Sequence, residues 1–232
     1  MTGYVFPFFR PADRNWETRS LSRVFLSVGE VERIGIVAYW KAEKDMKIAI
    51  LGWGSLLWED RPEFDKQHDE PWQYDGPELK IEFSRISTSR QGALTLVLDE
   101  DNGSPMVVAW CLSKRKTVED AICDLRCREG TVIRNIGCVR LPADISQPPE
   151  IGDWAREKNL DAAIWTRLPS NFGTETKKSF SVAAAVEYIK TLDACGKAKA
   201  AEYVWRAPGF VQTRVRNALQ REPWFPKTTH PA

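Results

Sequence analysis

The sequence predicts an α+β fold, with most strands early in the chain and most helices in the last third. Apolar runs and apolar–polar alternation, which are typical of strands, are concentrated between residues 46 and 112. Alanine-rich segments of helical character follow after residue 182. Because strands and helices are not interleaved along the chain, a sheet built from repeated βαβ units is not expected.

The strands are predicted from local patterns. The apolar run from Ile48 to Leu51 predicts a buried strand, and the alternation over 79–83 predicts a half-buried one. Apolar segments over 92–98 and 106–112 predict two more strands. Between them lies Asp101-Asn102-Gly103, whose residue types accept the positive φ of a tight hairpin turn. We therefore expect these last two strands to form an antiparallel pair.

A helix over 118–129 is marked at both ends. Thr117 is a favourable N-cap residue, and two acidic side chains in the first turn suit the helix dipole. Gly130 has the residue type that ends many helices. A further strand over 162–168 is expected to follow a connection that contains prolines and glycine. The chain is then expected to end in three helices, over 182–195 (closed by Gly196), 197–206 and 210–221.

The first 45 residues differ from the rest. Pro7, Pro11 and scattered charges interrupt any regular pattern there, whereas the first core strand begins just after Met46. We expect residues 1–45 to be an extension, or upstream translation from a misplaced start, and residues 46–232 to form a single domain that folds without them. The alternative is an ordinary N-terminal subdomain.

The composition argues against several classes of protein. The 232 residues carry 33 basic and 32 acidic side chains, a balance that does not favour binding to nucleic acid. No apolar stretch is long enough for a membrane span, and no secretory signal precedes the first strand. Five cysteines, an odd number, do not suggest a disulfide framework, and neither His68 nor His230 has a neighbour at metal-ligand spacing. We expect a cytoplasmic protein without a metal or other cofactor.

A glycine-containing loop follows the first strand. Glycine lets the backbone approach a ligand closely, so Gly52-Trp53-Gly54-Ser55 could offer backbone N–H groups to an anion or a polarised carbonyl. A dinucleotide-binding loop is a poor alternative, because Leu57 replaces the third glycine of that motif. A serine hydrolase built on Ser55 is also a poor one, because the G-x-S-x-G elbow is missing and histidines are scarce.

Glu129 occupies an unusual place for a carboxylate. At about 100° per residue it falls within roughly 20–40° of the apolar stripe that contains Val118 and Leu125. Burial and the negative end of the helix dipole both disfavour its ionised form, so its pKa is expected to be raised. A raised pKa suits a general acid–base group near neutral pH. The alternative is that the carboxylate reaches solvent or pairs with a nearby arginine: Arg126, Arg128 or Arg134.

Two short motifs resemble the γ-glutamylcyclotransferase superfamily, nearest to its ChaC-type, glutathione-degrading branch. The segment Trp53-Gly54-Ser55-Leu56-Leu57-Trp58 resembles the Tyr-Gly-Ser-Leu loop of that superfamily. The segment Leu125-Arg126-Cys127-Arg128-Glu129 resembles the one that carries its catalytic glutamate. The resemblance covers roughly residues 46–140. It implies a mixed, curved or barrel-like β-sheet flanked by helices.

The resemblance also implies a reaction. Glu129 would be the general acid–base group that lets the α-amino group of a γ-glutamyl amine or peptide attack its own γ-carbonyl, releasing 5-oxoproline without a cofactor. The backbones of the loop would hold the glutamyl oxygens, at Trp53, Gly54, Ser55 and Leu56.

Some features leave alternatives open. The sequence departs from the superfamily at Trp53, where tyrosine is usual, which puts the substrate preference in doubt. Arg85 and Arg90 follow the strand over 79–83 and are candidates to pair with a substrate carboxylate, although exposed arginines at strand ends are common. The alternative to an enzyme is a non-catalytic module that binds a small molecule on the same fold.

Overall fold

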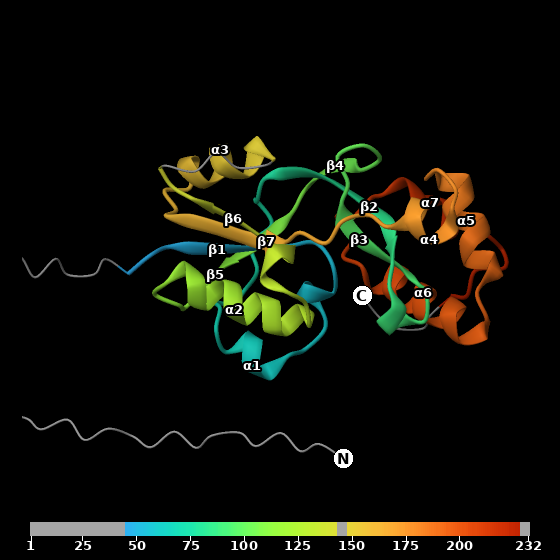
Figure 1. Ribbon diagram of the computed structural model, residues 1–232, viewed down its shortest axis with the longest axis horizontal. Coiled ribbons are helices and arrows are strands. Elements are labelled where there is room, and N and C mark those ends of the chain that lie inside the picture. Colours follow the sequence, from blue (N-terminus) through green and yellow to red (C-terminus); the bar gives the residue numbers. More distant parts are fainter. Residues whose placement is uncertain (1–44, 143–147, 228–232) are drawn as a thin grey trace, which may run out of the picture. The chain divides into compact units, whose positions relative to one another are not determined.

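The computed structural model describes residues 45–142 and 148–227 (Figure 1). Within these ranges the chain forms one four-stranded mixed sheet and one three-stranded antiparallel sheet. None of the helices in the described ranges is long and apolar enough to cross a membrane. The prediction that residues 1–45 are an extension falls almost wholly outside the described residues and stays a prediction.

The mixed sheet has β1 (Ile48–Gly52) near its centre, between one antiparallel and one parallel neighbour. β5 (Ala109–Leu112) pairs antiparallel with β1, and β7 (Ala162–Thr166) pairs parallel with it. β6 (Ile136–Arg140) then pairs antiparallel with β7 at the edge. Every residue of β1 is buried, as its apolar run predicts.

The antiparallel sheet is built around β2 (Glu78–Ile86), the long strand predicted from its alternation. β3 (Leu94–Leu98) lies on one side of it and β4 (Ser104–Val107) on the other. A bulge between Phe83 and Arg85 shifts the β2–β3 register. Bulges of this kind re-aim side chains and are common next to functional sites.

Helices cover both sheets. α2 (Val118–Glu129) and α3 (Pro149–Glu157) lie on opposite faces of the mixed sheet, while the helices after residue 171 gather beside the antiparallel sheet (Figure 1). Alternate residues of β1 therefore enter two apolar cores, with Ile48 and Ile50 in the core that contains α2 and Leu51 in the one that contains α3. The other helices are α1 (Pro62–Asp65), α4 (Phe172–Thr176), α5 (Val182–Thr191), α6 (Ala194–Arg206) and α7 (Arg214–Leu219). The described residues also form short 3₁₀ helices, namely η1 (Ser55–Leu57), η2 (Thr88–Arg90) and η3 (Ile133–Asn135).

The α+β class and the flanking helices are confirmed, but the sheet is not closed into a barrel. The predicted strand over 106–112 is divided instead. Its first part, β4, pairs with β2, and its second part, β5, pairs with β1. The break at Val108 carries the chain from the antiparallel sheet into the mixed sheet, so one apolar run serves two sheets.

The predicted antiparallel pair is wrong. Both β3 and β4 pair with β2, at Leu98↔Ile81 and Ser104↔Ile81, so β2 separates them. The predicted turn does form, with the Gly103 N–H donating to the Asp99 carbonyl over 2.7 Å. However, it carries the chain across β2 instead of returning it alongside β3, and Gly103 has no room for a side chain against the Lys80 backbone.

The C-terminal helices also begin and end at other residues than predicted. α5 ends at Thr191, and Asp193 then caps α6 by accepting a 2.7 Å hydrogen bond from the Gly196 N–H. Gly196 therefore lies inside α6, where an added Cβ would approach the Gln91 carbonyl oxygen to 2.7 Å. The segment predicted as a helix over 210–221 is α-helical only within α7.

Candidate active site

The glycine loop leaves β1 and turns at once into η1. The Leu57 N–H donates to the Gly54 carbonyl over 3.0 Å, and the Glu59 N–H donates to the Ser55 carbonyl over 2.9 Å. Gly54 is required here for a close approach, because an added Cβ would lie 2.6 Å from the hydroxyl oxygen of Tyr203. No described residue accepts a hydrogen bond from the backbone N–H of Gly54 or of Leu56. Both residues belong to the wall of the cavity described below.

Helix α2 places Glu129 beside this loop. The predicted ends of the helix are confirmed, since the Thr117 hydroxyl accepts a 3.2 Å hydrogen bond from the Asp120 N–H and Gly130 has a φ of 59°. The stripe that contains Val118 and Leu125 is buried against the mixed sheet. This packing fixes the rotation of the helix and turns Glu129, at its last position, toward the end of β1.

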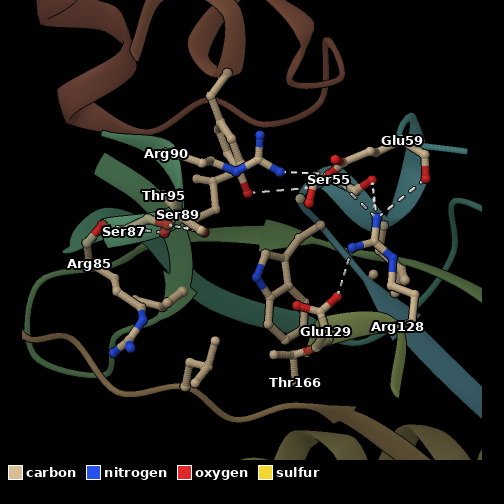
Figure 2. Close-up of a pocket in the computed structure, with 18 of the residues that line it drawn as sticks. Ser55, Glu59, Arg85, Ser87, Ser89, Arg90, Thr95, Arg128, Glu129 and Thr166 are labelled. Carbon is tan, nitrogen blue, oxygen red and sulfur yellow. Dashed lines mark hydrogen bonds and ion pairs between the residues drawn. The ribbon is translucent and has the colours of Figure 1, made fainter. Parts of the chain in front are cut away.

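One cavity of about 200 Å³ joins the loop, the end of α2 and the antiparallel sheet (Figure 2). Its volume suits a molecule smaller than a typical drug. The predicted shared pocket for Glu129 and the loop is confirmed, and all six residues proposed from the sequence line it: Trp53, Gly54, Ser55, Leu56, Arg85 and Glu129. Thr166 joins them because β1 and β7 run parallel and end at the same edge of the sheet.

The Glu129 carboxyl has the electrostatic setting of an acid–base group. Its side chain is only 17% exposed. Burial raises its pKa above the ordinary value of 4.5; the charge of Arg128 acts in the opposite direction, and the neighbouring charge of Glu59 adds to the rise. Oε1 lies 3.3 Å from Nη1 of Arg128. The predicted alternative of an arginine partner thus holds for Arg128, but the carboxyl still faces the cavity.

Glu59 is a second carboxylate in the cavity wall, and it is already engaged. Oε2 accepts a 2.7 Å hydrogen bond from Arg90, and Oε1 accepts a 2.9 Å hydrogen bond from Arg61. Burial works to raise its pKa, but the hydrogen bond from Arg90 and the nearby arginine charges outweigh burial and lower the pKa. The surroundings of Glu59 therefore favour its ionised form, and Arg90 already pairs with its carboxylate.

Arg85 is placed differently from Arg90. Its Nη1 donates a 2.8 Å hydrogen bond to the Pro169 carbonyl, and among the described residues it forms no ion pair with a carboxylate. Burial lowers its pKa. In Figure 2 it lies at the far end of the cavity from Glu129, near Ser87 and Ser89. Of these two arginines, Arg90 pairs with a carboxylate of the described residues and Arg85 does not.

Tyr203 was not anticipated from the sequence. It lies in α6 and is 5% exposed, and its hydroxyl accepts a 3.4 Å hydrogen bond from the Ser55 N–H. The guanidinium of Arg90 lies 4.9 Å from the centre of its ring. It is separated from Ser55 by 148 residues along the chain. No local pattern in the sequence points to this contact.

Across the described ranges, no group of three or more His, Cys, Asp or Glu side chains is arranged to hold a metal ion. The chain matches no model of a known protein family, and no curated protein is significantly similar to it. The geometry of this cavity and the two short motifs therefore carry the functional proposal.

Proposed function

We propose that this protein is a cytoplasmic γ-glutamylcyclotransferase-type enzyme, which releases 5-oxoproline from a γ-glutamyl amine or peptide without a cofactor. One observation carries the proposal: a glutamate with a raised pKa shares a small polar cavity with a glycine loop that has free backbone donors. An acid–base group and preorganised donors are what an intramolecular acyl transfer needs.

In the proposed reaction, Glu129 accepts a proton from the α-amino group of the substrate. The freed amine attacks the γ-carbonyl carbon of the same molecule, a C–N bond forms, and the bond to the leaving nitrogen breaks. The α-ammonium nitrogen loses two protons and the leaving nitrogen gains two, so atoms and charge balance without water. Glu129 carries protons from one nitrogen to the other.

The other residues of the cavity hold the substrate. The backbone N–H groups of Gly54 and Leu56 donate to the glutamyl oxygens, including the carbonyl oxygen on which charge develops. Arg85 pairs with a substrate carboxylate. Trp53, 5% exposed, supplies an indole wall where tyrosine is usual in the superfamily, and we expect this change to alter which leaving groups are accepted.

The test is 5-oxoproline release from glutathione and from a panel of γ-glutamyl amines and peptides. Glu129→Gln keeps the shape of the side chain but cannot accept the proton, so turnover should fall by ~10²–10⁴-fold. Glu119→Gln is the matched control, because this carboxylate lies at the other end of α2, outside the cavity, and pairs with Arg140. If the wild type binds γ-glutamyl compounds but converts none of them, the non-catalytic module is the better description.

A further inference from the structure

Arg128 contacts both halves of the site with one side chain. It is 4% exposed, and its Nη2 donates hydrogen bonds of 2.8 Å to the Ser55 carbonyl and 3.4 Å to the Glu59 carbonyl. Its Nη1 lies 3.3 Å from the carboxylate of Glu129. Figure 2 shows the guanidinium between these groups. The planar group thus bridges the turn that follows β1 and the last residue of α2.

This placement is costly for an arginine. A buried cation loses its hydration, and its Nε is buried without a hydrogen-bond partner among the described residues. Arg126, two residues earlier on the same helix, is half-buried, and its hydrogen bonds to described side chains go to the thiols of Cys123 and Cys127. The contacts of Arg128, unlike those of Arg126, go to residues that line the cavity.

We propose that Arg128 is a positioning residue, whose guanidinium locks the Ser55–Glu59 turn to the Glu129 carboxylate. The lock keeps the free N–H groups of the loop and the acid–base group at one fixed separation. A planar fork with several donors can do this, whereas the single ammonium of lysine cannot make all of the contacts together. The inference rests on the proposed role of Glu129 and adds a residue that holds Glu129 and the loop in register.

Arg128 also affects the protonation of Glu129. Its charge favours the ionised carboxylate, against burial and the charge of Glu59. The other groups that face Glu129 are the cations of the loop and of η2 and a phenol from α6: Arg61, Arg90 and Tyr203. Removing the charge of Arg128 should raise the pKa of Glu129 further, because the adjacent positive charge that favours the ionised carboxylate is lost.

Two substitutions separate position from charge. Arg128→Lys keeps a cation near Glu129 but loses the bridge to the loop, so kcat should fall at least about tenfold. The acidic limb of its pH profile of kcat/KM should stay within about half a pH unit of the wild-type position. Arg128→Met loses both, so kcat should fall and the acidic limb should move to higher pH. Arg126→Met is the matched control and should leave the rate and the pH profile unchanged.

A second readout does not depend on turnover. The full chain labelled with [δ-¹³C]glutamate reports the titration of Glu129 by NMR, with Glu129→Gln assigning the signal. Titration at higher pH in Arg128→Met, and unchanged in Arg126→Met, supports the inference even if the substrate proposed above is wrong. Wild-type kcat in Arg128→Lys would overturn the positioning role, as would an unchanged Glu129 titration in Arg128→Met. If Arg128→Met does not fold, the decision rests on Arg128→Lys. Its kcat is then compared with that of the wild type at a temperature at which both proteins are fully folded.

Discussion

The contact between Gly54 and Tyr203 gives a prediction about how the loop is held. Replacing Gly54 by alanine adds a Cβ at 2.6 Å from the Tyr203 hydroxyl oxygen, well inside van der Waals contact. Tyr203 is buried, and α6 is packed against the rest of the core, so the ring cannot retreat freely. The loop or the ring must shift, and the hydrogen bond from the Ser55 N–H to the hydroxyl is expected to break.

The free energy of unfolding should fall by about 2–4 kcal/mol in Gly54→Ala. Overpacking costs ~1–3 kcal/mol, and a lost hydrogen bond adds ~1 kcal/mol. For a protein of this size, each ~1 kcal/mol lowers the melting temperature by ~2–4 °C, so the variant should melt roughly 4–16 °C below the wild type.

Tyr203→Phe provides the matched rescue. Without the hydroxyl, the nearest atoms to the new Cβ are Tyr203 Cζ at 3.8 Å and Leu96 Cβ at 3.9 Å, which are ordinary contacts. In a double-mutant cycle followed by thermal and urea unfolding, the double variant should therefore be about as stable as Tyr203→Phe alone. The coupling energy then equals the ~2–4 kcal/mol that Gly54→Ala costs in the wild type. Additive losses would refute the idea that Gly54 is required by the close approach of Tyr203.

Two further predictions concern charged groups in the cavity. Burial raises the pKa of Glu129 in the folded protein above its ordinary value of 4.5. The free energy of unfolding of the wild type, relative to that of Glu129→Gln, should therefore be greatest at a pH below the ordinary value of 4.5. It should fall as the pH rises through the raised pKa. Urea unfolding at about pH 4 and about pH 8 measures this difference, and a constant difference would contradict it. Arg85→Gln should weaken substrate binding about tenfold or more, since a charge-assisted hydrogen bond is lost, with little change in melting temperature because only its bond to Pro169 is removed from the fold. An unchanged KM would remove Arg85 from the substrate site.

The parts of the site that depend on local sequence could be predicted. Helix periodicity placed Glu129 on the buried stripe of α2, and the residue types Thr117 and Gly130 marked its two ends. The burial of β1 and the turn into the glycine loop also follow from neighbouring residues. Because the C-terminal end of α2 and the loop after β1 lie at one edge of the mixed sheet, both motifs meet in one cavity.

What depends on distant contacts could not be predicted. The turn around Gly103 has the residues of a hairpin, but a turn sequence does not specify that β2 will lie between the two strands it connects. Tyr203 reaches the loop only because α6 packs against the antiparallel sheet. The difference between Arg85 and Arg90 likewise depends on a distant residue, because Glu59 forms an ion pair with Arg90 and not with Arg85.

The most direct test of the proposed function is the rate of 5-oxoproline formation by wild type, Glu129→Gln and Glu119→Gln at saturating γ-glutamyl substrate, with melting temperatures measured on the same samples. We predict turnover by the wild type and by Glu119→Gln, and a loss of ~10²–10⁴-fold in Glu129→Gln without a loss of stability. Undiminished turnover in Glu129→Gln would contradict the central claim that this carboxylate moves the proton.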